Sequence, residues 1–321
     1  MRKALLLVLT LFHALVCLAA EPYPSKTVRV IAPFAPGGTI DFTGRIISQQ
    51  LTEQLGRSFV VENRTGASGT IAAAMVAKSA PDGYTLMVMD TSGAVVPSLF
   101  KSLPYDVARD FVPITQIMAA PTVLVVGPSV KSSTLKEFIA LAQANPGKFN
   151  YGSSGAGSQN QLSAELFNRA ARVSIAHIPY KGGGEALAAV ISGQVAMTIA
   201  PITTVLSLVK GAKVRPLAIT TDDGKRSPAL PDVPSMSEAG VSGNTVSIWV
   251  GLVAPAGLAQ DIVNKLHAEV VKAIAVPSVR ERFVVQGGEV VGSNPEEFAM
   301  HIRNETQRWA DIIKSAGITA E

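Results

Sequence analysis

Residues 33–41 read PFAPGGTID and separate a strand-like run from a helical pattern. The run at 27–32 is rich in β-branched residues and ends at two prolines, which cannot donate a hydrogen bond to a neighbouring strand. Apolar residues then recur at helical spacing from Phe42 to Leu55, before Gly56. The glycine pair allows a sharp turn that brings a ligand close to amides at the helix N-terminus, where an anion is favoured. The stretch therefore predicts part of an anion site, although Thr39 or Asp41 suits a plain helix cap equally well.

The same design recurs at residues 149–167. A short strand is expected at 149–151, followed by the loop GSSGAGS at 152–158 and a helix that carries Leu162, Leu166 and Phe167. The loop offers amides and hydroxyls with almost no acidic competition. Two such loops, one in each half of the chain, predict a clamp for a molecule that carries carboxylates. Lys181, in the glycine-rich loop at 179–184, is a candidate cation for the same site, and a solvated surface lysine is the alternative.

The order of the predicted elements indicates an α/β fold. Strand, loop and helix repeat along the chain, which points to parallel sheets covered by helices. In such sheets ligands bind at the carboxyl ends of strands, so Thr91 and Ser92, after the strand at 84–89, are candidate ligand residues. Residues 110–113 are expected to form a surface connection, and 222–234 a surface crossing between two lobes.

Length and composition fit an exported globular protein. The chain has 321 residues, of which 47% are hydrophobic and 16% charged, enough for a sizeable core and about two domains. Residues 1–20 have a basic start, an apolar run and a small-residue end, which predicts a signal peptide cleaved near Ala20. Cys17 leaves a lipoprotein alternative open, and as the only cysteine it predicts no disulfide in the exported chain. Lys and Arg are scattered, so nucleic acid is not an expected partner.

Catalytic motifs fail on inspection of their spacing. The histidines at 177, 267 and 301 are isolated, and the exported chain has no cysteine to build a zinc site with them. The sequence GSSGA at 152–156 has alanine where the nucleophile elbow of serine hydrolases needs its second glycine. The dinucleotide fingerprint fails in the same loop, because Asn160 stands where its last glycine is required. We expect no cofactor, no metal and no catalysis, with a secreted serine hydrolase as a minor alternative.

With both loops considered, the chain resembles the Bug family, the periplasmic solute-binding receptors of tripartite tricarboxylate transporters. The resemblance covers nearly the whole exported chain and rests on PFAPGG followed by Asp41, VENR at 61–64, PDGYTL at 81–86, LPYD at 103–106, PYKG at 179–182, LPDVP at 230–234 and APAG at 254–257.

The resemblance implies a two-lobed periplasmic-binding-protein fold of type II that closes over a small carboxylate. Lobe 1 would comprise residues 21–122 and 248–321, and lobe 2 residues 123–247. The implied protein is a periplasmic receptor, expected to be a monomer, that transiently contacts integral-membrane permease subunits and delivers its ligand to them. A sensory module that docks on a membrane signalling protein is the alternative, and an adjacent permease or sensor-kinase gene would distinguish the two.

Family members hold one carboxylate between the two loops. The resemblance, carried over residue by residue, and the motifs described above together predict the following ligand-binding residues: Phe34, Gly37, Gly38, Thr39, Asp41, Thr91, Ser92, Ser153, Ser154, Gly157, Ser158, Gln161, Tyr180 and Lys181. The chain departs from the family pattern at Gln161, where histidine is usual, and at Ala200, where aspartate is common. The second departure favours a plain carboxylate over an amino acid. Asp41 either caps the helix, positions a water or receives an amino group.

Overall fold

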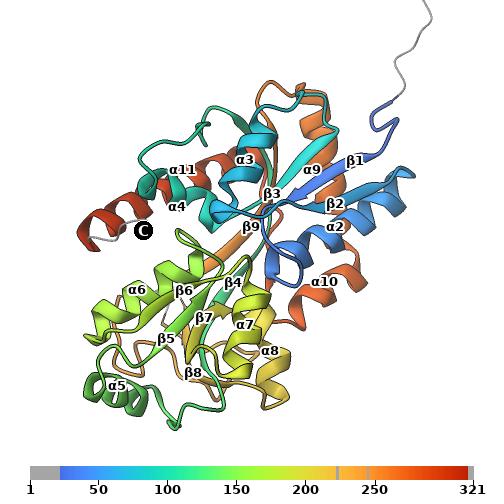
Figure 1. Ribbon diagram of the computed structural model, residues 1–321. Helices are drawn as coiled ribbons and strands as arrows, with labels where there is room; N and C mark the ends of the chain where they lie inside the picture. Colours follow the sequence, from blue (N-terminus) through green and yellow to red (C-terminus); the bar gives the residue numbers. More distant parts are fainter. Residues whose placement is uncertain (1–21, 222–223, 244–245, 317–321) are drawn as a thin grey trace, which may run out of the picture.

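One long strand, β4 (Phe111–Val126), joins the two halves of the molecule (Figure 1). Up to Pro121 it pairs with β9 (Ser247–Pro255). From Thr122 onward it pairs instead with β7 (Met197–Pro201) and β8 (Arg215–Thr220). The chain therefore passes from one sheet to the other within a single strand.

The structure is a computed structural model that describes residues 22–221, 224–243 and 246–316. The expected signal peptide at 1–20, including Cys17, lies outside these ranges. Within them, no helix combines the length and the apolar character needed to cross a membrane.

The first sheet, in the upper half of Figure 1, has the strand order β2-β1-β3-β9-β4, with β10 on the far side of β4. Its first three strands are parallel, and β9 runs against both neighbours. Successive residues of β1 and β3 face two separate hydrophobic clusters, so both faces of the sheet are buried under helices. The remaining strands are β1 (Val28–Ala32), β2 (Phe59–Asn63), β3 (Thr85–Asp90) and β10 (Glu289–Val290).

Two groups of helices cover this sheet. On one face, the cluster includes side chains of α2 (Thr39–Leu55), α9 (Gln260–Ala275) and α10 (Pro277–Val284), and it continues into helices of the second half. On the other face, the cluster includes side chains of α3 (Thr70–Ala77), α4 (Thr91–Leu99) and α11 (Pro295–Ala316), together with Leu162 from the second half. Helix α11 contributes the side chains of Phe298 and Trp309, which are both fully buried. A helix distant in sequence from β1–β4 therefore completes the hydrophobic core of the first sheet.

The second sheet, in the lower half of Figure 1, has the order β6-β5-β7-β4-β8. Its core includes Phe138, Tyr151 and Phe167, all fully buried. The other strands and the helices that cover them are β5 (Asn150–Ser153), β6 (Ala176–Pro179), α5 (Leu135–Ala144), α6 (Gln159–Ala171), α7 (Gly183–Ser192) and α8 (Ile202–Lys210).

The structure confirms the predicted two-lobed α/β architecture and corrects its detail. The sheets are mixed and not purely parallel, because β4 and β9 run antiparallel to each other and β4 also opposes β7 and β8. Residues 111–113 belong to β4 and do not form a surface connection; Phe111 is buried. Pro113 is accommodated at an irregularity in the pairing with β9, where a ladder hydrogen bond is not required.

Two helices were not predicted. Thr91 and Ser92 were expected only to follow the strand at 84–89, and in the structure α4 begins directly at Thr91, whose hydroxyl accepts a hydrogen bond from the amide of Trp249 at 3.1 Å. Similarly, α8 follows β7 without any intervening residue. No glycine or proline stands between β3 and α4, and Pro201, which precedes α8, is itself the last residue of β7, so neither junction has a separate loop signal.

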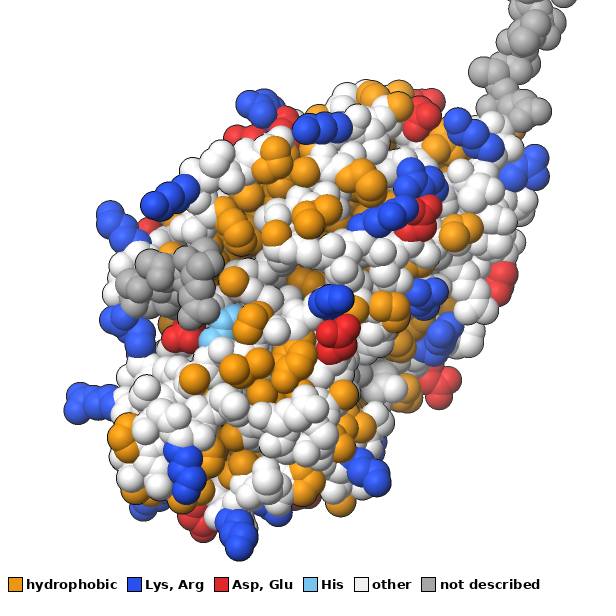
Figure 2. Space-filling view, viewed as in Figure 1, with side chains coloured by type: hydrophobic (Ala, Val, Ile, Leu, Met, Phe, Trp, Pro, Cys, Tyr) orange, Lys and Arg blue, Asp and Glu red, His pale blue; other side chains and the backbone are white. Residues whose placement is uncertain are grey.

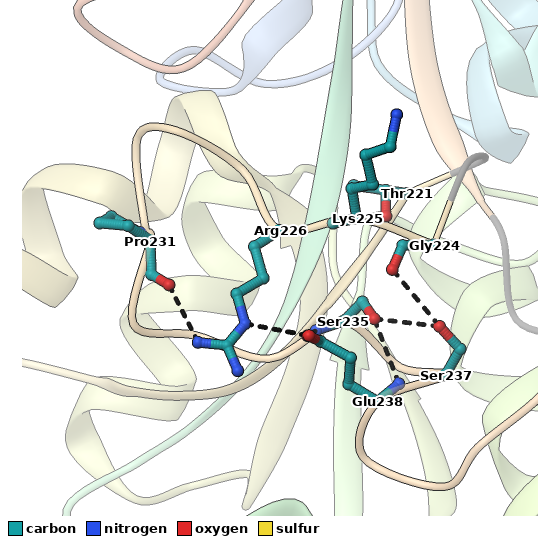
Figure 3. Close-up of polar contacts among 8 residues, drawn as sticks. All are labelled: Thr221, Gly224, Lys225, Arg226, Pro231, Ser235, Ser237 and Glu238. Carbon is teal, nitrogen blue, oxygen red and sulfur yellow. Dashed lines mark hydrogen bonds and ion pairs between the residues drawn. The ribbon is translucent and has the colours of Figure 1, made fainter.

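The segment after β8 packs on the second lobe and is not simply a surface crossing. Leu230 and Val233 are buried, and the amide of Ile219 donates to the carbonyl oxygen of Pro234 at 2.9 Å. Figure 3 shows how polar contacts hold this segment: the Arg226 guanidinium donates to Glu238 at 3.0 Å and to the carbonyl of Pro231 at 3.1 Å. Residues 222–223 of the predicted crossing lie outside the described ranges.

Candidate functional site

The strand directions bring the candidate loops to one junction. β3 runs in the same direction as β4, because both oppose β9, so β1 and β3 end facing the second sheet. β7 opposes β4 and runs parallel to β5, so β5 and β7 end facing the first sheet. The carboxyl ends of strands from both lobes therefore meet between the lobes, which is where open α/β sheets bind ligands.

The first loop connects β1 to α2 and is built on Gly37. This glycine has φ +89°, a conformation that side chains disfavour. Its amide donates a hydrogen bond to Asp41 Oδ2 at 3.1 Å. The other carboxylate oxygen of Asp41 accepts from Asn63 Nδ2 at 2.9 Å and from Arg45 Nε at 2.9 Å. Asp41 thus ties the loop to its own helix and to the end of β2.

These contacts decide the ionisation of Asp41. Burial alone would raise the pKa of its carboxyl group, but hydrogen bonds from Arg45, Asn63 and the Gly37 amide together outweigh burial and hold the pKa below its ordinary value. Asp41 is therefore ionised at neutral pH, and the Arg45 guanidinium, 2.9 Å away, compensates its charge. Because its oxygens are occupied within lobe 1, Asp41 acts as a brace for the loop.

The second loop connects β5 to α6 and is built on Gly157, with φ +84°. Its amide donates to Gln161 Oε1 at 2.6 Å. Ser158 is the N-cap of α6, and its hydroxyl accepts from the amide of Gln161 at 3.4 Å. The hydroxyl of Ser154 donates to Asn160 Oδ1 at 2.9 Å.

The two loops share one local construction. In each, a glycine with positive φ precedes the N-cap of the helix, and its amide is bound by the side chain four residues further on: Asp41 in the first loop and Gln161 in the second. Asp41 and Gln161 therefore occupy equivalent positions. The sequence singled out both residues, one as a puzzling acid and the other as a departure from the family pattern, and the structure gives both the same role.

Ser153 faces into the second lobe. It is fully buried, and its hydroxyl lies 2.6 Å from His177 Nε2 on β6. His177 Nδ1 in turn lies 3.4 Å from Gln161 Nε2. The imidazole thus links the end of β5 to the brace of the second loop, a connection that the sequence did not reveal because the residues are 16 and 24 positions apart.

The two lobes touch each other around these loops. The amide of Ala35 donates to the carbonyl oxygen of Lys181 at 3.3 Å. A Cβ atom at Gly182 would lie only 2.9 Å from Ala35 Cβ, so the approach requires glycine there. Thr39 Oγ1 and Thr203 Oγ1 form a second interlobe contact at 2.9 Å. We call this arrangement, in which the two lobes are in contact, the closed form.

The remaining predicted residues lie at different depths. Phe34 is packed in the core of lobe 1. Thr91 and Ser92 are buried within lobe 1, where the Ser92 hydroxyl donates to Asp90 Oδ2 at 3.1 Å. Tyr180 is half-buried and donates its amide to the carbonyl of Ser153 at 2.9 Å. Gly38 is buried as the N-cap of α2.

Lys181 presents its backbone to the opposite lobe, while its side chain is exposed. Its amide donates to Glu185 Oε2 at 3.2 Å. On the face of the molecule shown in Figure 2, lysine, arginine and acidic side chains are interspersed. Among the described residues, no group of three or more histidine, cysteine or acidic side chains is placed to hold a metal ion.

Sequence reasoning missed two interlobe residues, Ser68 and Thr203. The hydroxyl of Ser68 donates to the carbonyl oxygen of Ala156 in the second loop. Neither residue belongs to a pattern that points to a site, because their importance depends on which parts of the two lobes come together.

This fold and this junction of loops define a two-lobed solute-binding protein. The model of the tripartite tricarboxylate transporter family receptor matches residues 43–318, and the chain belongs to this family. The family is one of solute-binding receptors. The resemblance to Bug proteins is confirmed by a solved structure of the periplasmic binding protein BugD, which is 32% identical, with a TM-score of 0.90 over 93% of this chain and 100% of that one.

Two further solved structures contain ligands. A protein of R. palustris, described with adipate, is 35% identical, with a TM-score of 0.89 over 92% of this chain and 99% of that one. MatC of Rhodopseudomonas palustris, described with bound malate, is also 35% identical, with a TM-score of 0.86 over 91% of this chain and 100% of that one. Both ligands are dicarboxylates.

Proposed function

We propose that this protein captures a small organic carboxylate between its lobes and delivers it to a tripartite tricarboxylate-type permease. The observation that carries the proposal is that two equivalent loops, one from each lobe, lie at strand ends that face the opposite lobe, at the N-termini of α2 and α6. The first turn of a helix has amides without intrahelical partners, and the helix dipole favours an anion there. Adipate and malate in the structures of relatives support a carboxylate as the ligand.

The chemistry of the loops favours recognition by neutral donors. The nearest fixed charge, Asp41, is compensated by Arg45 and held away from the ligand by its own hydrogen bonds. Backbone amides of both loops and the hydroxyls of Ser154 and Thr39 are then the groups that meet the carboxylate. The exposed side chain of Lys181 adds a positive charge beside the first loop, whose Ala35 amide donates to the Lys181 carbonyl oxygen.

Capture requires the lobes to move as two bodies. We place lobe 1 at residues 21–122 and 248–321 and lobe 2 at residues 123–247, because β4 changes partners between Pro121 and Thr122. A carboxylate that contacts both loops binds the closed form more tightly than the open form, and this difference in affinity drives closure. We further propose that the protein is exported to the periplasm, acts as a monomer and docks transiently on the permease.

Thermal unfolding tests the ligand class. Protein is unfolded and refolded to remove any bound ligand, and its melting temperature is measured with increasing adipate or malate. Binding to the folded state predicts a melting temperature that rises with ligand concentration. Ser154→Ala should reduce this rise, whereas Ser278→Ala, at an exposed position of α10, should not. A broad panel of carboxylates that produces no shift would overturn the proposal.

Uptake tests the permease. In cells that carry the neighbouring integral-membrane permease genes, accumulation of the labelled carboxylate should depend on this protein. Accumulation that is unchanged by deletion of its gene would contradict the transport role and leave ligand binding intact.

A further inference from the structure

The turn that precedes α3 has an unusual backbone. Ala67 has φ +44° and Ser68 has φ +52°, both in the left-handed region that residues with a side chain rarely adopt. Gly66 and Gly69 flank them with φ +131° and +87°. Two successive left-handed residues without glycine carry a conformational cost, and such turns persist only where the surrounding structure holds them.

Lobe 1 holds one side of this turn. A Cβ atom at Gly69 would lie 2.9 Å from Pro33 Cβ, and one at Gly66 would lie 2.5 Å from Ile71 Cδ1. The turn therefore sits directly against the start of the first loop. Its position is fixed by the same residues that lead into the proposed ligand site.

Lobe 2 holds the other side through Ser68. Its hydroxyl donates to the carbonyl oxygen of Ala156, and it lies 3.2 Å from the point where a Cβ atom of Gly155 would be. Ser68 is only 8% exposed. Gly155 has φ +113° and no side chain, which leaves room for the hydroxyl beside the second loop.

We propose that Ser68 is the latch of the closed form: it bonds the second loop across the lobe boundary and thereby slows ligand release. Ser68 is a positioning residue, because its hydroxyl bonds the backbone of Ala156. The left-handed turn aims its hydroxyl across the boundary. The inference rests on the proposed function, since a latch acts only on a receptor that opens and closes.

Dissociation kinetics separate this role from a structural one. The probe is adipate or malate, whichever binds the wild-type protein. In stopped-flow measurements Ser68→Ala should release it about fivefold faster with an association rate within about twofold of wild type, the effect of one hydrogen bond made only in the closed state. The control is Ser79→Ala, which removes a hydroxyl that donates to Met75 within lobe 1 at 3.0 Å. Equal release rates for the two variants would overturn the latch.

A glycine substitution separates the hydroxyl from the backbone. Ser68→Gly removes the hydroxyl and also relieves the left-handed strain at this position. It should raise the melting temperature of the ligand-free protein and still accelerate release. Release as slow as in wild type would show that the hydroxyl does not hold the lobes together.

A cross-link tests the contact between Ser68 and the second loop without the need to know the ligand. In a disulfide, the Cβ atom of one cysteine lies about 3 Å from the sulfur of the other, close to the 3.2 Å between Ser68 Oγ and the Cβ position of Gly155. Ser68→Cys combined with Gly155→Cys should therefore give, on oxidation, a peptide that links residues 68 and 155 in mass spectrometry. Failure of wild type to bind any carboxylate refutes the proposed function, whereas absence of the link refutes the latch itself.

Discussion

The two ligand loops use the same backbone construction with different side-chain chemistry. In lobe 1 the brace is Asp41, a carboxylate that needs Arg45 and Asn63 to remain ionised while buried. In lobe 2 the brace is Gln161, a neutral amide whose second partner is His177. Both loops thus have a side-chain hydrogen-bond acceptor at this position. Where the acceptor is a carboxylate, neighbouring groups must compensate its negative charge.

The largest expected effect comes from removing the charged brace. Asp41→Ala leaves the Gly37 amide without its acceptor and removes one of the two acceptors of Asn63 Nδ2, so the free energy of unfolding at pH 7 should fall by about 3 kcal/mol. Gln161→Ala removes a neutral acceptor and should cost about 1 kcal/mol. Urea denaturation of both variants measures the difference. Equal losses of unfolding free energy in the two variants would contradict the proposed difference between the charged Asp41 and the neutral Gln161.

The pH dependence of stability in the Asp41 and Gln161 variants follows from the lowered pKa of Asp41. Its pKa lies below the ordinary value of 3.8, so its stabilising contribution is complete above about pH 4 and is lost as the pH falls further. The stability gap between wild type and Asp41→Ala should therefore narrow below pH 4, whereas the gap for Gln161→Ala should stay constant over that range.

A second carboxyl group in lobe 1, that of Asp90, is also buried, and no lysine or arginine in the described part of the chain forms an ion pair with it. Burial raises its pKa to about 7, against a smaller opposing effect of the hydrogen bond from Ser92. The unfolded chain loses this proton near pH 4 and the folded chain retains it until about pH 7, so stability falls as the pH rises between these values. Asp90→Asn should remove this fall and be about 2 kcal/mol more stable than wild type at pH 8. Parallel pH profiles for the two proteins would contradict this assignment.

A pair of neighbouring glycines tests whether the contact between the loops matters for binding. In the closed form a Cβ atom at Gly182 would lie 2.9 Å from Ala35 Cβ, whereas one at Gly183 would have nothing within 4 Å. Gly182→Ala should weaken binding of adipate or malate about tenfold, equivalent to about 1.4 kcal/mol, and Gly183→Ala should change it less than twofold. Calorimetric titration of both variants provides the measurement, and equal affinities would argue against closure of these loops on the ligand.

The smallest expected effects concern Gly37 and Gly157, the positive-φ glycines that precede α2 and α6. Gly37→Ala and Gly157→Ala should each destabilise the protein by about 1 kcal/mol, because alanine disfavours this conformation. A Cβ atom at Gly157 would be 3.2 Å from Leu99 Cδ1 on α4, whereas one at Gly37 would have nothing within 4 Å. Gly157→Ala should therefore weaken ligand binding by about a further threefold relative to Gly37→Ala. The reverse order would show that the first loop is the more closely packed of the two.

Much of the fold could be predicted where local signals were strong. The first helix was expected to end at Leu55, before Gly56, and α2 ends there, because apolar periodicity marks its length and the glycine marks its end. Residues 111–113 of β4 were expected to be a surface connection, since Pro113 is typical of a loop. The course of β4 as the strand shared by both sheets depends on pairing with β9, which is more than a hundred residues away.

The candidate site was predictable to the level of its two loops. Their glycines, serines and flanking strands and helices are local features, and the family resemblance identified the same residues. The roles of Asp41 and Gln161 were not predictable, because a side chain that binds an amide four residues earlier looks identical in sequence to one that faces a ligand. Ser68 was missed because its partner, Ala156, is brought to it only by the contact between lobes.

A crystal structure of the wild-type protein with adipate or malate bound tests the central claim most directly. We expect one carboxylate group of the ligand to accept hydrogen bonds from the loop at 33–41 and from the loop at 153–158 at the same time. A carboxylate held by one of these loops alone, or bound outside the junction of the lobes, would contradict it.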